Sequence, residues 1–584
     1  MSASPIVGIL NKEKIPIFLP GDLEYERSVA TANLLYRFSR PGFVVQPESI
    51  PHVQYIVVQA KERGIPITIK NGGHSYAGFS STDKGILLDL SKLNQVELDL
   101  DSGIAKLSGG AKWGHAYRAL LNGKLDGYVI NGGRCPFVGV SGFTLGGGLG
   151  PFTRSFGMGV DTLKEVTMVA ADGSLVTVNE DDAPNTPNGE LFWALRGGGG
   201  GNFGVVVTLK TSIEKLKSSE GLVVSGRYTW FPGSDDKSLS DLMATMKKFY
   251  VINWPNELTI DTSWLCNLQQ SKSLLGIRFL VYYNGNKADF DKLIDRYLPR
   301  SELGKQLKRR SMQEKSTRFF HETLVSQWSE ETVKAFPENP SYTIFSSFVF
   351  KKDTGKLTSI ISIIRDEMQS FREKFSEETG LLQVTFIHSG GKASEKQRSD
   401  TAFRWRDGTY HAYIMIDWAE KWLGQDMGDF CTDFKRKLRP FSMCQRAAFI
   451  NFADRQLQES LWEKAYYGNN YSKLQRVKQT WDPDNYFAFN QSIRPPSSKK
   501  KSSRKKKAAS QTAMFMAASI GDDSGSEEAS VEGYGTEDEG PVMDDVDDEA
   551  WVDGVARDQW ETFIPPPPTA ELLRLPGYPY YRGF

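Results

Sequence analysis

The order of hydrophobic and polar residues predicts both strands and helices in the first 215 residues. Apolar or alternating runs, typical of strands, occur at "IPITIK", "GILLDLS", "QVELDLDSGIAKLSG" and "EVTMVAADGSLVTV", where "DSG" and "DG" predict hairpin turns. The run "GFVVQPES" predicts a strand leading to a helix cap, and "SIPHVQYIVVQAKERG" has helical spacing up to Gly64. This part of the chain is therefore expected to be α+β.

Residues 220–445 combine longer strands with longer helices. The segments "EGLVVSGRYTWF", "LTIDTSWLCNL" and "SLLGIRFLVYYNG" are typical of strands, and "SDLMATMKKFYVI", "ADFDKLIDRYL" and "TGKLTSIISIIRDEMQSFREKF" are typical of helices. Long strands with aromatic residues at alternate positions favour a twisted antiparallel sheet with helices on one face. The other face is then available to form the wall of a pocket.

The pattern ends near residue 496, where the composition changes sharply. A basic run occupies 499–507, fourteen acidic residues lie in 522–553, and a proline-rich end follows. Such a stretch buries too little apolar surface to offset its ordering entropy, so we expect 497–584 to be a disordered tail. The basic run has two interpretations: it pairs loosely with the acidic half of the tail, or it serves as a nuclear signal or a contact for an acidic protein partner.

Length and composition narrow the classes of protein further. A chain of 584 residues is too long to form a single compact core, so two or more domains are expected. The balance of 71 basic and 71 acidic residues argues against nucleic-acid binding by the core. The four cysteines and six histidines show no metal-ligand spacing, so no metal is expected. Without a signal-like or membrane-length apolar run, we expect an intracellular, cytoplasmic protein, with the basic run leaving the nucleus open.

Three glycine-dense stretches are the main candidates for ligand binding: "NGGHSYAG" (71–78), "GVSGFTLGGGLG" (139–150) and "RGGGGGNFGVV" (196–206). The last contains G-x-G-x-x-G, but the strand-like "VVVTLKTSI" follows it. A nicotinamide-binding Rossmann motif must open a helix, which argues against a nicotinamide-dependent dehydrogenase. Successive backbone N–H groups in glycine loops still bind phosphate, so three such loops indicate an extended ligand.

His74 and Cys135 each directly follow a glycine-rich turn, "NGGH" and "GGRC". Either residue alone is more commonly structural. Their shared setting favours contact with the same ligand as the glycine loops.

Four segments resemble the berberine-bridge-enzyme-like branch of the vanillyl-alcohol-oxidase family of FAD-linked oxidases, fungal type. They are "PITIKNGGHSYAG", "NGGRCPFVGVSGFTLGGGLG", "ELFWALRGGGGGNFGVVV" and "YYGNNYSKLQRVKQTWDPDNYFAFNQSI", and the resemblance spans roughly residues 30–495. It implies a two-lobed α+β fold with a PCMH-type FAD-binding domain over 1–215 (core about 38–215). A substrate-binding domain over 216–445 follows, and the segment 446–496 returns to the FAD lobe.

The resemblance implies FAD held by two covalent bonds, from His74 to the flavin 8α-methyl and from Cys135 to flavin C6. Two anchors leave the site open to a bulky substrate and should raise the flavin potential. Val138 matches a position that admits O2, and Tyr76 matches a residue lining the site in oligosaccharide oxidases. The other cofactor-binding residues implied are Asn71, Gly72, Gly73, Ser75, Gly139, Ser141, Gly142, Gly147, Gly148, Gly204, Val206 and Asn490.

The chain departs from the family at three positions of the site. Phe143 stands where many relatives have His or Asn, Phe452 in "INFAD" replaces a tyrosine that deprotonates the substrate, and Ile387 in "QVTFIHSGG" replaces an assisting carboxylate. The catalytic candidates that remain are His388, Tyr410 and Asp454. For each of them a packing or capping role is the commoner alternative.

The sequence therefore predicts an FAD-dependent oxidase that takes hydride from a C–H bond next to oxygen or nitrogen in a bulky secondary metabolite. O2 would be the acceptor and H2O2 the product. An oligosaccharide oxidase is an alternative, weakened by Phe452 because a sugar hydroxyl benefits most from a base. A flavin-binding protein with little turnover, acting through its tail as an interaction protein, is another.

Overall fold

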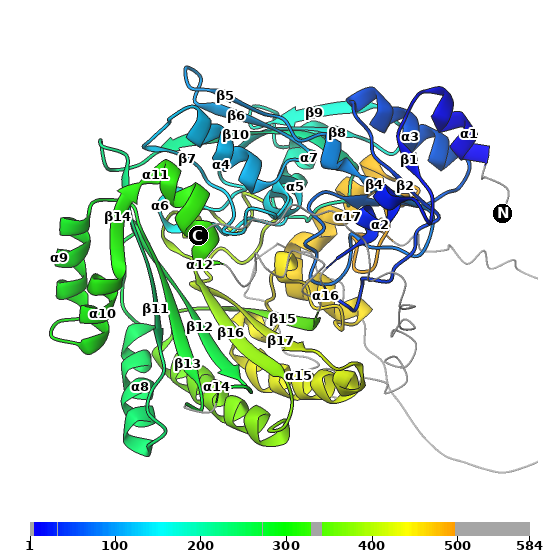
Figure 1. Cartoon of the computed structure of the whole chain (residues 1–584). Coiled ribbons are helices and arrows are strands. Elements are labelled where there is room, and N and C mark those ends of the chain that lie inside the picture. The colour runs from blue at the N-terminus through cyan, green and yellow to red at the C-terminus, as the bar shows by residue number, and fades with distance from the viewer. Residues whose placement is uncertain (1–4, 32, 271–272, 329–340, 497–584) are drawn as a thin grey trace, which may run out of the picture. The chain divides into compact units, whose positions relative to one another are not determined.

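The computed structural model describes residues 5–31, 33–270, 273–328 and 341–496. The expected tail, 497–584, lies outside the described residues. The described chain forms three sheets and the helices that cover them, which confirms the α+β class (Figure 1). No helix in the described part of the chain is long and apolar enough to cross a membrane.

The first sheet has four strands in the order β1-β2-β4-β3, and β2 and β3 both run parallel to β4. The helix α3 (Ile50–Glu62) begins after Ser49, whose hydroxyl accepts a hydrogen bond from the backbone N–H of His52, as the predicted cap requires. The third strand ends at Lys70, so the first glycine loop starts at the edge of this sheet. The elements are α1 (Pro5–Lys12), β1 (Ile17–Phe18), α2 (Leu23–Val29), β2 (Phe43–Val45), β3 (Ile67–Lys70) and β4 (Ile86–Asp89).

The second sheet is antiparallel and is built around the long strand β10 (Val205–Lys215), which pairs with β6, β7 and β8. This strand starts directly after the G-x-G-x-x-G sequence, so the glycine loop opens a strand and a Rossmann motif is excluded. The other elements are β5 (Val96–Asp99), β6 (Ile104–Ser108), α4 (Trp113–Asn122), β7 (Tyr128–Ile130), α5 (Val140–Leu145), α6 (Thr153–Phe156), β8 (Leu163–Val169), β9 (Leu175–Asn179) and α7 (Pro187–Leu195).

The third sheet has seven antiparallel strands in the order β14-β11-β13-β12-β16-β17-β15. Figure 1 shows α8, α14 and α15 along one face of it, and their apolar side chains join those of the strands in one buried core cluster. The strands are β11 (Leu222–Trp230), β12 (Leu258–Asn267), β13 (Gly276–Tyr283), β14 (Ser311–Lys315), β15 (Tyr342–Phe350), β16 (Gly380–His388) and β17 (Tyr410–Trp418). The helices are α8 (Asp236–Phe249), α9 (Lys287–Tyr297), α10 (Glu302–Arg310), α11 (Ser316–Arg318), α12 (Leu324–Gln327), α14 (Thr354–Lys374) and α15 (Gly424–Leu438).

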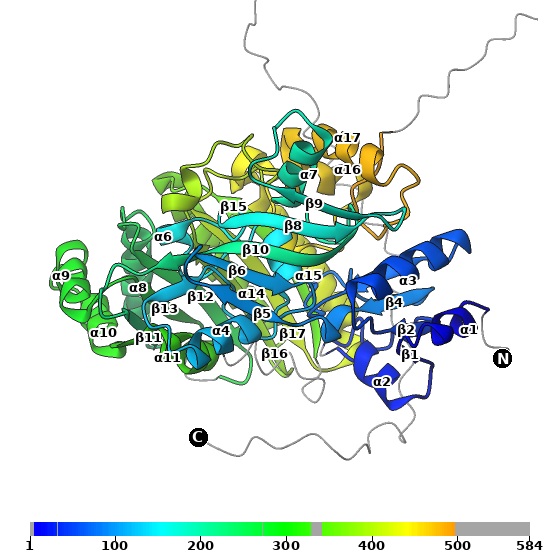
Figure 2. The same ribbon diagram turned by 90° about the horizontal axis from the view of Figure 1, so that it is seen from above.

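The last described segment packs back on the first half of the chain. Figure 2 shows α17 (Tyr471–Trp481) beside α7, with α16 (Glu459–Tyr467) next to it. Lys478 on α17 is fully buried, pairs with Asp482 at 2.7 Å, and donates hydrogen bonds to the carbonyl oxygens of Asn202 and Phe487. This ion pair therefore ties the third glycine loop to the last described segment.

Replacing Lys478 by methionine should lower the free energy of unfolding by about 3–5 kcal/mol, because Asp482 stays buried without its partner. The control is Lys164→Met, which removes an exposed ion pair of similar length with Glu180 and should cost less than about 1 kcal/mol. Urea unfolding followed by fluorescence measures both. Equal losses in the two variants would contradict this role of the buried pair.

Candidate active site

A cavity of about 600 Å³ brings the three glycine loops together with the third sheet. His74 and Cys135 both line it, and so do Val138, directly before the second loop, and Ile387 from β16. The first two loops pack directly on each other, since a Cβ on Gly72 would lie 2.5 Å from the backbone nitrogen of Gly139. Glycine is therefore required at Gly72 for the loops to bring His74 and Cys135 to one wall.

Most of the cofactor-binding residues expected from the sequence lie in the wall of this cavity. Three do not line it: Gly147 and Gly148 are buried against the rings of Phe403, Phe449 and Phe143, and Asn490 is exposed. The residues that do line it, beside His74 and Cys135, are Asn71, Gly72, Gly73, Ser75, Tyr76, Val138, Gly139, Ser141, Gly142, Gly204 and Val206.

Several glycines border open space instead of protein. A Cβ on Gly142 would meet nothing within 4 Å, and on Gly200 or Gly201 nothing nearer than 3.6 Å. Packing against the protein therefore does not explain the glycine at Gly142 or Gly200, although the positive φ of Gly201 favours glycine there. Bare backbone beside a cavity of this size fits a large ligand that the main chain approaches closely, as FAD would require.

The charged residues around the cavity are all basic. Among the described residues that line it, Arg27, Lys70, Lys112 and Arg134 carry positive charge and no aspartate or glutamate occurs. Arg27, Lys70 and Arg134 pair with Glu24, Asp89 and Asp261, so most of this charge is already balanced. The charge of Lys112 favours an anionic group such as the diphosphate of FAD. The described residues contain no cluster of three His, Cys, Asp or Glu side chains that could hold a metal.

His74 is held as a neutral imidazole. Burial, together with the positive charges of Lys112 and Lys70, lowers its pKa to about 4. Its lone pair is therefore available for bond formation throughout the neutral and mildly acidic range. Lys112 lies in the same wall, and burial lowers its pKa also.

Attachment of FAD to His74, which the family resemblance implies, should change less than twofold between pH 7.5 and 5.5 in flavin-free Cys135→Ala protein, because the imidazole stays neutral. An imidazole with the ordinary pKa of about 6.5 would lose roughly tenfold over this interval. In Lys112→Met, which lacks one of the two charges, the pH at which attachment slows should rise. The fraction of protein-bound flavin after denaturation is the readout, and a tenfold loss at pH 5.5 in the parent would contradict the assignment.

The three catalytic candidates from the sequence do not line the cavity formed by the described residues. His388 is buried, its Nδ1 accepts a hydrogen bond from the backbone N–H of Ile260 at 3.3 Å, and burial holds its pKa well below the usual range. Tyr410 donates its hydroxyl hydrogen to the carbonyl oxygen of Tyr250 at 2.8 Å inside the helix-covered core. Side chains alternate along a strand, so both residues face away from the cavity.

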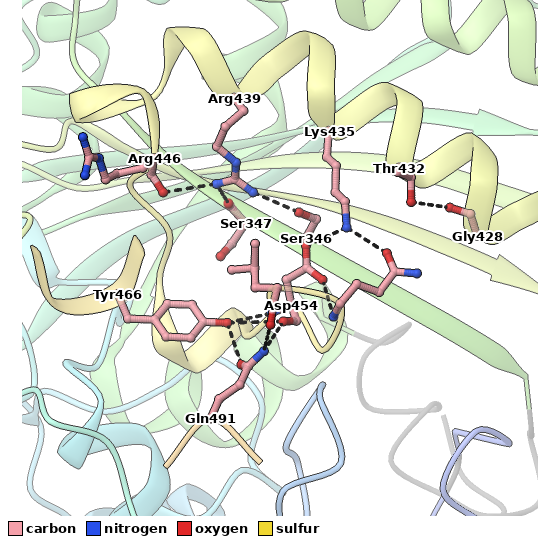
Figure 3. A network of polar contacts seen from close by, with 12 residues as sticks. Ser346, Ser347, Gly428, Thr432, Lys435, Arg439, Arg446, Asp454, Tyr466 and Gln491 are labelled. Carbon is pink, nitrogen blue, oxygen red and sulfur yellow. Dashed lines mark hydrogen bonds and ion pairs between the residues drawn. The ribbon is translucent and has the colours of Figure 1, made fainter. Parts of the chain in front are cut away.

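Asp454 belongs to a buried polar network behind the cavity wall (Figure 3). Its carboxylate pairs with Lys435 at 3.3 Å and accepts a hydrogen bond from the backbone N–H of Gln456, and Gln491 donates to its carbonyl oxygen. The neighbouring Phe452 and Ala453 do line the cavity. These contacts hold the segment that carries Phe452 and place Asp454 behind the cavity wall, and its expected catalytic role stays a prediction.

The end of the cavity near the third sheet is an aromatic cluster made of Tyr76, Phe345, Tyr413 and Phe452. The rings of Tyr76 and Phe345 stack with centroids 3.9 Å apart, and those of Tyr413 and Phe452 lie 4.7 Å apart. Tyr413 lies on β17, three residues after Tyr410 and on the opposite face, and it lines the cavity. Sequence reasoning missed this residue, although the alternation in "YHAYIMIDW" separates the two tyrosines.

Two family models match the chain: an FAD binding domain over residues 41–179, and berberine and berberine-like over residues 448–494. Among curated proteins, an FAD-linked oxidoreductase of Bacillus subtilis is 26% identical over 81% of this chain and 95% of its own. Berberine bridge enzyme-like 9 of Arabidopsis thaliana is 27% identical over 84% of this chain and 90% of its own.

Solved structures share the fold. Berberine bridge enzyme from Eschscholzia californica has a TM-score of 0.72 at 21% identity, covering 84% of this chain and 99% of its own. Xylooligosaccharide oxidase from Myceliophthora thermophila C1 has a TM-score of 0.70 at 22% identity, with the same coverage. These neighbours confirm the two-lobed PCMH-type fold expected from the sequence.

The fold, the cavity and these matches define an FAD-linked oxidoreductase. The two family models and the curated relatives show that the chain is similar to the berberine-bridge-enzyme-like FAD-linked oxidases, as the glycine-loop and C-terminal motifs indicated.

Proposed function

We propose that this protein is an oxidase that holds FAD by two covalent bonds, through His74 and Cys135, and oxidises a bulky aromatic small molecule. The bond oxidised is a C–H next to oxygen or nitrogen. The observation that carries the proposal is the convergence of His74 and Cys135 on one cavity beside bare glycine backbone. Residues 1–215 and 446–496 are the proposed FAD lobe, and 216–445 the proposed substrate lobe.

FAD, when bound, accepts hydride from the substrate and passes the two electrons to O2, giving H2O2. The residues of this chain supply the rest. His74 offers a neutral nitrogen, Cys135 a thiol, and Lys112 a positive charge for the diphosphate. Val138 is the proposed small side chain beside the path of O2.

Tyr413 is the proposed acceptor of the substrate proton. Its side chain lies on the cavity face of β17 and touches Phe452, the residue that stands where relatives have a tyrosine. A tyrosine that enters the same space from another strand can, as the phenolate, accept a hydrogen bond from a substrate O–H or N–H and take its proton as hydride leaves, which restores the neutral phenol. The loss of the tyrosine at position 452 therefore leaves a proton acceptor in the site.

The aromatic cluster supports a flat, largely apolar substrate. Stacked and tilted rings offer faces and edges that pair with another ring, whereas a sugar requires hydrogen-bond partners for its hydroxyls. Both kinds of substrate occur among the similar structures, since one berberine bridge enzyme structure holds (S)-reticuline and another neighbour holds xylobiose. The fungal type, a secondary metabolite as substrate and a protein partner for the tail remain predictions.

Anaerobic mixing with a panel of aromatic alcohols, aromatic amines and oligosaccharides tests the proposal. We expect the 450 nm absorbance of the flavin to bleach with an aromatic compound, and H2O2 to form when air is admitted. Faster bleaching by an oligosaccharide would overturn the substrate class. Bleaching by none of them, with flavin present, would favour the interaction-protein alternative.

A further inference from the structure

Arg134, the residue directly before Cys135, extends its side chain away from its own loop and into the third sheet. Its Nη2 lies 2.7 Å from Oδ2 of Asp261 on β12, and the two side chains are only 6% and 1% exposed. Its Nη1 donates a hydrogen bond to the carbonyl oxygen of Leu149 at 2.6 Å. The loop that carries Cys135 is thus tied to a strand more than a hundred residues away.

Two aromatic rings enclose the guanidinium. Its central carbon lies 5.5 Å from the ring centroid of Tyr282 and 5.7 Å from that of Trp328, and Trp328 donates a hydrogen bond to the Tyr282 hydroxyl. Asp261 is fixed from behind, because its Oδ1 accepts a hydrogen bond from the backbone N–H of His388 at 2.9 Å. Arg134 cannot move from this position without leaving a buried charge unpaired.

We infer that Arg134 and Asp261 form a positioning pair that places the Cys135 sulfur for attachment to the flavin, while attachment at His74 does not depend on them. The inference rests on the proposed function. Adjacent residues share a peptide plane, so an anchored guanidinium restricts the direction in which the Cys135 side chain leaves the chain. His74 lies on the loop that follows β3. This loop touches the Cys135 loop at Gly72, but it also has hydrogen bonds of its own, because Asn71 donates to the carbonyl oxygen of Gly109 and Tyr36 to that of Tyr76.

Attachment at Cys135 has a strict geometric demand. One S–C bond forms while the thiol S–H and one ring C–H break, both protons pass to water, and the two electrons pass to O2, the acceptor of the proposed oxidase. Such a step requires the sulfur and carbon to approach within about 3–3.5 Å in the correct direction, and a 1 Å displacement can cost about a hundredfold in rate. If the loop that carries Cys135 loses the Arg134–Asp261 pair, we therefore expect formation of the S–C bond to slow while FAD still binds.

Peptide mapping by mass spectrometry of the purified flavoprotein tests the inference. The variants are Asp261→Asn, which keeps the acceptor for His388 but loses the charge, and the control Asp161→Asn. Asp161 forms an equally buried pair with Arg406 at 2.8 Å, which also joins the two halves of the chain. We expect Asp261→Asn to lower the FAD-modified fraction at Cys135 at least tenfold and to leave that at His74 within twofold. Asp161→Asn should change neither.

The outcomes separate the inference from the proposed function. Parent protein without flavin on Cys135 would refute the bicovalent proposal itself. A second result would overturn the positioning pair: FAD is found on both His74 and Cys135 in the parent, and Asp261→Asn carries as much FAD on Cys135 as the parent does. A loss of similar size at both sites, or in both variants, would also overturn it, because the effect would be general loss of structure. If Asp261→Asn does not yield folded protein, Arg134→Lys must show the selective loss at Cys135. In that case, an unchanged ratio of the FAD-modified fraction at Cys135 to that at His74 overturns the inference.

Discussion

The double variant His74→Ala/Cys135→Ala should release its flavin when the protein is denatured, whereas the parent should keep it. Acid precipitation of the parent is expected to leave the yellow colour in the pellet, and precipitation of the double variant should move it to the supernatant. The physical reason is that denaturation removes every non-covalent contact in the cavity and leaves only bonds to the two side chains. Each single variant should keep the colour in the pellet through the remaining bond.

The matched controls for this experiment are His52→Ala and Cys444→Ala, which change the same residue types outside the cavity wall. Both should behave as the parent does. Flavin in the supernatant of the parent would contradict covalent attachment. A coloured pellet from the double variant would mean that a third residue holds the flavin.

Tyr413→Phe should lower kcat by about 10²–10⁴-fold, the usual contribution of a positioned acid or base. The substitution keeps the ring and its contact with Phe452, so binding of an aromatic substrate should be little changed. Stopped-flow measurement of anaerobic flavin bleaching isolates the step in which the proton is lost. A substrate with a more acidic O–H should suffer less from the substitution.

Tyr410→Phe is the control on the same strand. Its hydroxyl bonds to the Tyr250 carbonyl oxygen on the helix-covered face, so this variant should lose about 1 kcal/mol of stability and keep its rate within twofold. The reverse result, a slow Tyr410→Phe and a normal Tyr413→Phe, would return the catalytic role to the residue that the sequence suggested.

The strands, the first helix cap and the glycine loops could be predicted from the sequence because each has a local cause. The strand-like pattern of alternating side chains predicted β12 and β13. The strand-like residues after Gly204 argued against a Rossmann loop, as the position of β10 confirms. The cofactor residues followed from the family motifs, and most of them line one cavity. Gly147, Gly148 and Asn490 belong to the same motifs but lie outside this wall, since a motif does not say which glycines face a ligand and which face a ring.

The reacting end could not be predicted in the same way. Tyr410 and Tyr413 differ only in the face of β17 that they occupy, and the sequence leaves open which face the helices cover. The sequence does not show that Asp454 pairs with Lys435, which lies 19 positions earlier on another element. The pairing of Arg134 with Asp261 likewise depends on tertiary packing and has no signal in either local sequence.

A crystal structure of the protein as purified, with electron density for the flavin, tests the central claim most directly. The account predicts continuous density from the His74 imidazole to one end of the ring system and from the Cys135 sulfur to the adjacent edge, with Tyr413 facing the open side. Density for a flavin separated from both side chains would contradict the covalent account. A cavity without any flavin would contradict the assignment of the site itself.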